Sequence, residues 1–345
     1  MTVDRIVVTG ATGNVGTSVI EALSADPEVG SIVGVARRKP EWTADKTTWH
    51  TADVLTDNLV EIFAGADVVI HLAWQFQPTH QPVTTWEANV LGSVRVFDAV
   101  AAARVPTLVY ASSVGAYSPG PKDVPVAESW PTHGWPDAAY TREKAYIERV
   151  LDSFELAQPD VRVVRMRPGF LFKRESASQQ RRLFAGRLLP VRRLRPPIVP
   201  DLPGLRFQAL HTADAAQAYV LAARSDIRGP VNLAADPVVD PVLLAECLGA
   251  RVVAAPAWPV RMALSAAWRL HLVPAAPGLF DAVLRLPIMD CTRARTELGW
   301  TPRQTSRAAI AEFLGGLRDG AGMDTAPLHP ESETAVSDEV IAGSR

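Results

Sequence analysis

Cysteine is scarce in this chain of 345 residues, which contains only Cys247 and Cys291. Two cysteines supply neither a disulfide framework nor a metal site, so we predict no metal centre and a reducing, cytoplasmic environment. Long hydrophobic runs are also missing. The most apolar stretch, Trp258–Leu272, is shorter than the ~18 residues that span a bilayer, and arginines interrupt it. We therefore predict no membrane span, and we expect Trp258 and Leu270 to be buried within the protein.

Neither sign of charge dominates the chain: 35 Lys and Arg residues stand against 37 Asp and Glu, for a net charge of -2. This balance gives no general attraction to nucleic acid or to an anionic membrane, so we expect a small-molecule partner and no nucleic acid. The residues ahead of the first predicted strand show no signal-peptide pattern, which favours a cytoplasmic location.

A glycine-rich turn near the N-terminus is the strongest local signal that is present. The apolar run Arg5–Thr9 predicts a buried strand, and Thr17–Leu23 predicts a helix. Three glycines lie between them, which is typical of a dinucleotide site. The first allows a tight turn, the second lets the phosphates approach the backbone, and the third lets the helix pack closely on the strand. We assign to that site Gly10, Thr12, Gly13, Asn14, Val15 and Gly16.

Strands and helices alternate from this turn to about residue 170, which is typical of a doubly wound parallel sheet. We predict an α/β Rossmann domain over residues 1–172, with residues 205–234 returning to it. An arginine- and proline-rich composition from Lys173 to Pro200 marks the departure into a smaller substrate lobe, residues 173–204 and 235–318. Residues 319–345 turn polar and acidic without periodicity, so we expect a disordered tail.

The end of the second predicted strand, Ser31–Ala36, bears on the choice of cofactor. Arg37 and Arg38 follow it, and no acid occurs before Glu41. A carboxylate here would bind the adenosine ribose, whereas arginines pair with a 2′-phosphate, so the sequence favours NADP and leaves NAD open. Other strand ends of this domain add further cofactor contacts, namely Asp53 beside the adenine, Val54, Leu72 and Ala73.

Two side chains with acid–base chemistry lie four residues apart on a predicted helix, Asp137–Leu151, for which Asp137 is a suitable N-cap. Tyr140 and Lys144 share one face of that helix, and a cation beside a phenol lowers the pKa of the phenol. Ser113 ends the predicted strand Thr107–Ser113, at the sheet edge where ligands of such folds bind. These three residues are candidates for catalysis.

The ordered combination of glycine turn, Ser113, Tyr140, Lys144 and Arg167-Pro168-Gly169 resembles the extended short-chain dehydrogenase/reductase family. That family includes the NAD-dependent epimerases/dehydratases and many ketoreductases, and the resemblance covers roughly residues 3–315. It implies that Tyr140 is the general acid/base, that Lys144 holds the nicotinamide ribose and that Ser113 binds the reacting oxygen. It further implies that Pro168 and Gly169 border the nicotinamide, and that the protein forms a homodimer.

Two positions depart from the members that act on nucleotide sugars. Those members tend to have an asparagine where this chain has Arg167 and an arginine where it has Phe207. Either a diphosphate clamp or a solvent-facing surface would explain the arginines from Arg174 to Arg195. Asn89 on a predicted helix is either a structural bridge to a neighbouring strand or a polar element of the site, and we favour the bridge. Tryptophans on segments near the expected site favour an apolar or ring-bearing substrate: Trp74, Trp86, Trp130 and Trp135.

Three functions follow from these patterns. The first is an NADP(H)-dependent oxidoreductase that interconverts a carbonyl and an alcohol, with Tyr140 as acid/base. The second is a nucleotide-sugar epimerase or dehydratase that recycles NAD. The third is a non-catalytic NADP-binding regulator, which the presence of both Tyr140 and Lys144 disfavours because a sensor needs no proton-transfer pair.

Overall fold

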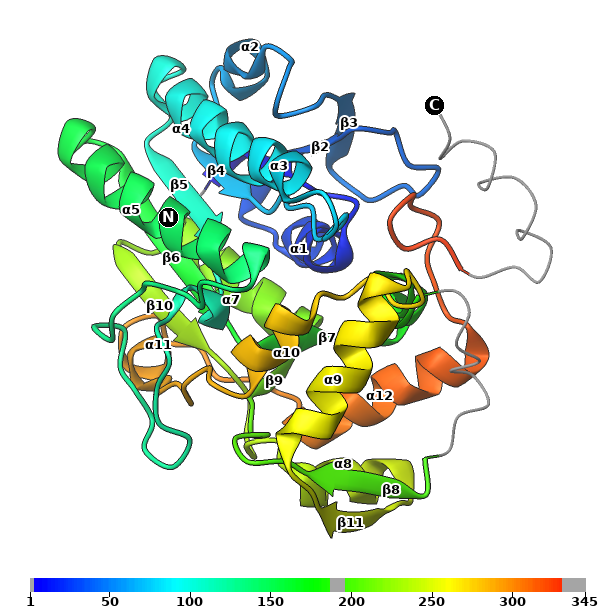
Figure 1. Ribbon diagram of the computed structural model, residues 1–345. Helices are drawn as coiled ribbons and strands as arrows, with labels where there is room; N and C mark the ends of the chain where they lie inside the picture. Colours follow the sequence, from blue (N-terminus) through cyan, green and yellow to red (C-terminus); the bar gives the residue numbers. More distant parts are fainter. Residues whose placement is uncertain (1–2, 187–195, 331–345) are drawn as a thin grey trace.

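A computed structural model describes residues 3–186 and 196–330, and its centre is a seven-stranded parallel sheet (Figure 1). The strand order is β10-β6-β5-β4-β1-β2-β3. From β1 the chain continues through β2 and β3 to one side and through β4, β5 and β6 to the other, so a crevice opens between β1 and β4. The strands are β1 (Val3–Thr9), β2 (Val29–Ala36), β3 (Thr47–Thr51), β4 (Val68–His71), β5 (Thr107–Ala111), β6 (Arg162–Pro168) and β10 (Gly229–Leu233).

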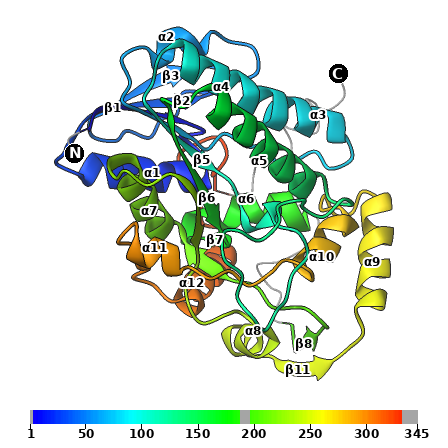
Figure 2. The same ribbon diagram turned by 90° about the vertical axis from the view of Figure 1, so that its left-hand side faces the viewer.

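Helices cover both faces of this sheet, which confirms the predicted doubly wound fold (Figures 1 and 2). Along β1, Ile6 and Val8 belong to one apolar core and Val7 to the other, because successive strand side chains point to opposite faces. One face is packed by α1 (Asn14–Ala25) and α7 (Thr212–Arg224), and the other by α2 (Leu59–Phe63), α4 (Gly92–Ala102) and α5 (Ala139–Ala157).

The helix that precedes β5 is not regular. It begins as α3 (Pro82–Trp86), passes through a π-helical turn, η1 (Glu87–Leu91), and continues as α4. The start of α5 also differs from expectation, because its N-cap is Ala138 and no side chain caps it. Asp137 as the N-cap was therefore a wrong prediction, since the helix begins one residue too late for that carboxylate.

The remaining elements form smaller units beside the carboxyl edge of the sheet (Figure 2). The paired strands are β7 (Phe170–Phe172) with β9 (Ala209–His211), and β8 (Ile198–Asp201) with β11 (Arg251–Ala254). The helices are α6 (Ala177–Gln180), α8 (Pro241–Leu248), α9 (Ala257–Arg269), α10 (Pro277–Val283), α11 (Thr292–Thr296) and α12 (Ser306–Asp319). Short turns are η2 (Val114–Ala116), η3 (Arg174–Ser176) and η4 (Arg181–Ala185).

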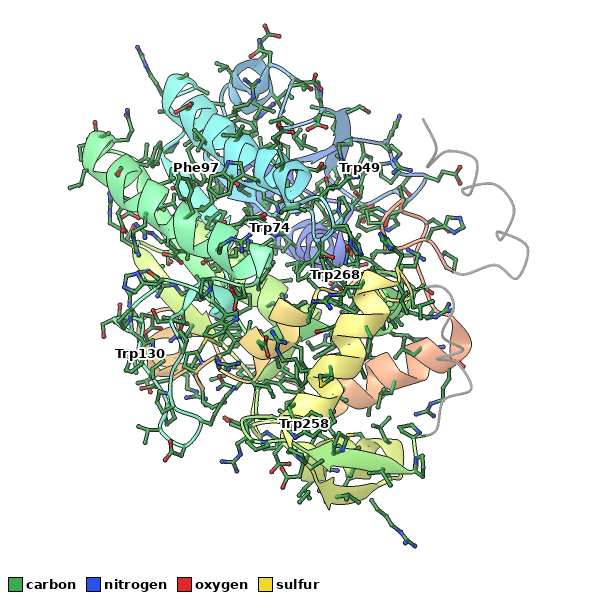
Figure 3. All side chains as sticks on the ribbon, viewed as in Figure 1. Trp49, Trp74, Phe97, Trp130, Trp258 and Trp268 are labelled. Carbon is green, nitrogen blue, oxygen red and sulfur yellow. The ribbon has the colours of Figure 1, made fainter. Side chains whose placement is uncertain are left out.

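Helix α9 is more exposed than its apolar sequence predicts. Trp258 is 65% exposed and Leu270 is 68% exposed, so their predicted burial is wrong. The helix packs along one side only, where Trp268 stacks on His80 with ring centroids 4.2 Å apart. Figure 3 shows Trp258 and Trp268 toward opposite ends of α9. No helix within residues 3–186 and 196–330 is long and apolar enough to cross a bilayer.

The first part of the predicted disordered tail is folded. Residues 320–330, which we call the C-terminal strap, follow α12 and return toward the glycine turn (Figure 1). Leu328 is fully buried and Thr325 is 2% exposed. The prediction of disorder is wrong for this segment, because its buried side chains and backbone hydrogen bonds fix it. Residues 331–345 lie outside the described part of the chain.

Candidate active site

The glycine turn has the geometry that a close backbone approach requires. Gly10 adopts a φ of +69°, and a Cβ added there would lie 2.6 Å from the backbone nitrogen of Ala73. A Cβ on Gly16 would collide with the carbonyl of Gly10, so the third glycine lets α1 pack onto the turn. A Cβ on Gly13 would meet only the Gly10 oxygen, at 3.3 Å, which leaves its other sides open.

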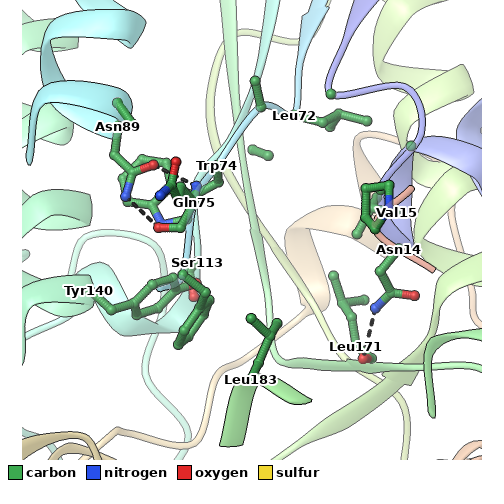
Figure 4. A pocket seen from close by; sticks show the side chains of 18 of the residues that line it. Asn14, Val15, Leu72, Trp74, Gln75, Asn89, Ser113, Tyr140, Leu171 and Leu183 are labelled. Atoms are coloured by element: carbon green, nitrogen blue, oxygen red, sulfur yellow. Dashed lines mark hydrogen bonds between the residues drawn. The ribbon is translucent and has the colours of Figure 1, made fainter. Parts of the chain in front are cut away.

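A cavity of about 1010 Å³ lies along the carboxyl edge of the sheet, beside this turn. Figure 4 shows Asn14, Val15 and Leu72 on one side of it, and Ser113 and Tyr140 on the other. Every residue that the sequence assigned to the site lines this cavity: Gly10, Thr12, Gly13, Asn14, Val15, Gly16, Arg37, Arg38, Asp53, Val54, Leu72, Ala73, Ser113, Tyr140, Lys144, Pro168 and Gly169. The fold thus brings together segments that are more than 150 residues apart in sequence.

The three candidate catalytic residues come from two neighbouring elements. Tyr140 and Lys144 lie one turn apart on α5, and Ser113 follows β5 and is hydrogen-bonded to the Tyr140 side chain. The Ser113 hydroxyl also accepts a hydrogen bond from the backbone of Gly115, at 3.0 Å. Lys144 Nζ donates to the carbonyl of Ala111 at 2.6 Å. A phenol, a hydroxyl and an ammonium therefore face one cavity.

Burial is the largest influence on the pKa values of Tyr140 and Lys144. It raises the pKa of Tyr140 to about 12, and the hydrogen bond with Ser113 opposes that shift only in part. Burial also lowers the pKa of Lys144 well below its usual value, although Glu143 and Glu148 oppose this shift. The expected lowering of the Tyr140 pKa by Lys144 is therefore wrong for this structure. The cost of burying a phenolate outweighs the other effects on Tyr140.

The loop after β4 places aromatic rings against the catalytic residues. Trp74 lies under Lys144, with Nζ 3.4 Å from the ring centroid, and Phe76 stacks on Tyr140 at 4.5 Å. Asn89 fixes this loop, because its side chain accepts from the nitrogen and donates to the carbonyl of Gln75, at 2.6 and 2.7 Å. Asn89 thus bridges η1 to this loop rather than to a strand, and it also lines the cavity. The π-helical turn η1 carries this residue.

The far end of the cavity holds the residues assigned to the adenosine. Arg37 and Arg38 follow β2 and are exposed to solvent. Asp53 follows β3, where its carboxylate accepts a hydrogen bond from the nitrogen of Leu55 at 2.9 Å. Pro168 ends β6 and Gly169 follows it, where the Gly169 nitrogen donates to the carbonyl of Leu233.

Other candidates lie away from the cavity. Arg167 is buried and pairs with Glu148 at 2.8 Å, so it replaces the family asparagine without lining the site. Arg174 pairs with Asp319 on the surface.

Of the four tryptophans expected near the site, Trp74 lines the cavity. Three others within the described chain do not, namely Trp86, Trp130 and Trp135. Four members of the arginine cluster lie outside the described residues: Arg187, Arg192, Arg193 and Arg195.

Several lining residues had no signal in the sequence. Apart from Tyr219, they come from short or irregular segments whose position depends on tertiary packing: Phe76, Leu183, Phe184, Tyr219, Leu279, Ala326 and Pro327. Tyr219 could have been noticed only as an aromatic residue in the alanine-rich helix α7. The strap residues fall in a segment that composition assigned to disorder.

Two buried polar atoms in the cavity fit a dinucleotide. Asn14 donates to the carbonyl of Leu171, but its Oδ1 has no hydrogen-bond partner within the described chain. The Tyr219 hydroxyl is likewise buried and unpartnered among the described residues. Buried polar atoms are normally satisfied, so both are suited to hydrogen-bond a ligand. Together with the open side of Gly13, they fit a bound nicotinamide dinucleotide.

Comparison with known proteins agrees with this geometry. The family model of the NAD-dependent epimerase/dehydratase family matches residues 6–234, which is more than half of the chain. The chain belongs to the NAD-dependent epimerase/dehydratase family. The match begins in β1 and ends after β10, so it covers the glycine turn and all three candidate catalytic residues.

Relatives of this epimerase/dehydratase-family protein carry out more than one reaction. It is 38% identical over 109 residues to an L-arabinose 1-dehydrogenase (NAD(P)(+)) of Haloferax volcanii, covering 32% of this chain and 41% of that protein. It is 30% identical over 168 residues to a UDP-glucose 4-epimerase of Yersinia pestis, covering 45% of this chain and 49% of that protein. The matched part thus spans half or less of the length of these relatives.

Solved structures share the fold of this epimerase/dehydratase-family protein at low identity. MoeE5 in complex with UDP-glucuronic acid and NAD superimposes with a TM-score of 0.67 at 22% identity, over 91% of this chain and 99% of that one. The Thermus thermophilus UDP-glucose 4-epimerase complex with NAD also gives 0.67, at 21% identity and the same coverage. These likenesses establish the architecture.

Proposed function

We propose that this protein is an NADP(H)-dependent oxidoreductase that interconverts a carbonyl compound and an alcohol. The observation that supports this most directly is the convergence of Ser113, Tyr140 and Lys144 on the cavity that begins at the glycine turn. A bound nicotinamide supplies or accepts the hydride in such a reaction. The residues of the chain then have to hold the substrate oxygen and move its proton.

In the reductive direction the carbonyl carbon gains a hydride, the C=O π bond breaks toward oxygen, and that oxygen takes a proton. Tyr140 delivers the proton, because a phenol with a pKa of about 12 remains protonated at neutral pH. The Ser113 hydroxyl donates to the same oxygen and orients it. Lys144, whose Nζ donates to the carbonyl of Ala111, would bind the nicotinamide ribose.

The cofactor-binding residues follow from the same arrangement. The nitrogens at the start of α1 and the open side of Gly13 would hold the pyrophosphate. Asp53 would lie beside the adenine. Arg37 and Arg38 would pair with a 2′-phosphate, which supports NADP over NAD.

The stoichiometry of the cofactor tests this function. We expect purified protein to oxidise one NADPH for each carbonyl group reduced, which is measured as the loss of nicotinamide absorbance against product formed. A product formed with no net change in absorbance would contradict the proposal and indicate cofactor recycling.

A second candidate, nucleotide-sugar epimerase or dehydratase, rests on the similarity to the Yersinia pestis UDP-glucose 4-epimerase. UDP-glucose incubated with the protein distinguishes the two, since an epimerase converts it without consuming added cofactor. A non-catalytic regulator has less support, because it would not need an acid/base phenol, a hydroxyl and an ammonium in one cavity.

A further inference from the structure

The part of the cavity beside Tyr140 has walls that differ from the cofactor end. We call it the substrate half; its walls come from the loop after β4 (residues 74–77), from residues 179–184 and from residues 279–286. Among the lining residues of these described segments, none is charged. Rings and branched alkyl groups dominate, with Phe76, Phe184 and Leu279 on three different segments.

The aromatic walls are in contact with the catalytic phenol. Phe76 stacks on Tyr140 with 24° between the ring planes, and Phe184 meets Phe76 edge-on at 5.1 Å. A substrate whose carbonyl group reaches Tyr140 therefore has its remaining atoms beside these rings. Substrates with rings and alkyl groups gain the most binding free energy from such apolar walls.

Hydrogen bonds to backbone carbonyls occupy the side-chain amide donors of Gln75 and Gln77. Gln77 Nε2 donates to the carbonyl of Leu183 at 2.6 Å and to that of Pro274 at 3.3 Å. The side-chain amide of Gln75 donates to the carbonyl of Gln77, at 2.7 Å. These contacts fix the walls and use amide groups that could otherwise bind sugar hydroxyls.

We propose that the substrate is an apolar, ring-bearing ketone or secondary alcohol rather than a nucleotide sugar; this rests on the proposed oxidoreductase function. A diphosphate buried in the substrate half would need paired cations, since an unpaired buried charge is very costly. The described walls supply none besides Lys144, which α5 places beside Tyr140 at the cofactor. An apolar body needs no such partner.

A substrate panel with NADPH tests this proposal. It compares a bicyclic apolar ketone, the same ketone bearing several hydroxyls, and a UDP-linked 4-keto sugar. We expect NADPH oxidation with the apolar ketone at a kcat/KM at least tenfold above that of the hydroxylated compound. NADPH oxidation that prefers the hydroxylated or UDP-linked compound overturns the apolar assignment alone. If none of the three compounds causes NADPH oxidation and the protein epimerises UDP-glucose, the proposed function itself is overturned.

A pair of nearly isosteric variants locates the effect in the substrate half. Leu279→Gln introduces an amide into the α10 wall, whereas Leu279→Met keeps it apolar at similar volume. We expect Leu279→Gln to raise KM for the apolar ketone about tenfold with a smaller change in kcat, and Leu279→Met to raise KM by less than about threefold, because it keeps the wall apolar. Equal KM values in both variants would show that this wall does not contact the substrate.

A separate observation concerns the strap. Thr325 Oγ1 donates a 2.9 Å hydrogen bond to the carbonyl of Thr12, within the glycine turn, and Ala326 and Pro327 line the cavity. Arg182 Nη2 donates to the carbonyl of Pro327 at 2.8 Å. The strap therefore joins the turn assigned to the pyrophosphate to η4, which carries walls of the substrate half.

We infer that the strap is part of the cofactor site and slows release of the bound dinucleotide. Any ligand on the glycine turn lies next to Thr12, Ala326 and Pro327, and its exit is obstructed by a segment that is fastened at Thr325 and Leu328. Cofactor retention by the strap does not depend on which substrate is reduced.

Two truncations that differ only in the strap test this inference. A chain ending at Gly320 lacks all of the strap except its first residue, and a chain ending at Pro330 keeps the whole strap. We expect the first to release NADPH at least tenfold faster in stopped-flow displacement and the second to match the full chain. Thr325→Val, which removes only the hydroxyl donor, should show a smaller acceleration at an unchanged melting temperature. Full-chain release rates in both the Gly320 truncation and Thr325→Val would overturn the inference.

Discussion

Tyr140 combines burial, a raised pKa and contact with two aromatic rings, and the proposed proton transfer passes through its hydroxyl. We predict that Tyr140→Phe lowers turnover by on the order of 10²-fold or more, because the variant keeps the ring but has no proton to donate. NADPH binding should stay close to wild type. Steady-state kinetics and a fluorescence titration measure the two effects.

The same helix provides the control for this variant. Tyr146 is 46% exposed and does not line the cavity. Tyr146→Phe should leave turnover unchanged. If Tyr140→Phe also retained full turnover, the proton donor would have to be another group.

Arg37 and Arg38 are the residues expected to distinguish NADPH from NADH, which lacks the 2′-phosphate. We predict that replacing both by alanine weakens NADPH binding by about tenfold or more and leaves NADH binding unchanged, since only NADPH offers the 2′-phosphate that guanidinium groups pair with. Lys39 follows directly, is exposed and does not line the cavity, so Lys39→Ala is the control. Equal losses for both cofactors would assign the arginines a different role.

Glu148 connects helix α5 to strand β6 beneath the catalytic residues. Its carboxylate is fully buried, contacts Arg165 and Arg167 at 3.0 and 2.8 Å, and accepts from Ser112. Although burial opposes it, the hydrogen bonds and charges of these partners lower the pKa of Glu148 to about 2. The network fixes the helix that carries Tyr140 and Lys144.

We predict that Glu148→Gln lowers the free energy of unfolding by roughly 3–5 kcal/mol, because it removes the carboxylate partner of the buried Arg167 guanidinium, whereas Arg165 keeps Asp152 and Glu155. Denaturant unfolding at neutral pH measures this. Glu297→Gln breaks an exposed pair with Arg293 and should change stability by less than about 1 kcal/mol.

The pH dependence of that contribution has a defined sign. Because the folded pKa of Glu148 lies below its ordinary value, its stabilising contribution is complete above about pH 4.5 and is lost as the pH falls toward 2. The wild-type protein should therefore lose more stability across this interval than Glu148→Gln does. Parallel pH profiles for the two proteins would contradict the assignment.

For the assembled protein, the family resemblance implies a dimer formed by the helices around α4 and α5. Apolar side chains are exposed there, with Val83 67%, Leu91 45% and Tyr146 46% accessible. We predict that light scattering gives twice the chain mass of 37.2 kDa. Tyr146→Glu should convert the protein to monomers, and a monomeric wild type would disprove the prediction.

Local patterns were enough to predict the sheet and the cavity residues around the glycine turn, Ser113, Tyr140 and Lys144. The glycine spacing after a buried strand and the four-residue spacing of Tyr140 and Lys144 depend only on helix and strand geometry. The walls of the substrate half were not predictable, because Phe76 and Leu279 meet only through packing of distant segments. The strap was missed because its polar composition conceals the few buried contacts that order it, such as Leu328.

The π-helical turn at Glu87–Leu91 has a consequence for sequence change in this region. Such a turn holds one residue more than a regular helix, and each residue of an α-helix rotates the next by about 100°. A single deletion here would straighten the coil and swing Asn89 off the backbone of Gln75. Trp74 and Phe76 would then lose their support, so shortening this helix by one position should reshape the cavity that η1 itself borders.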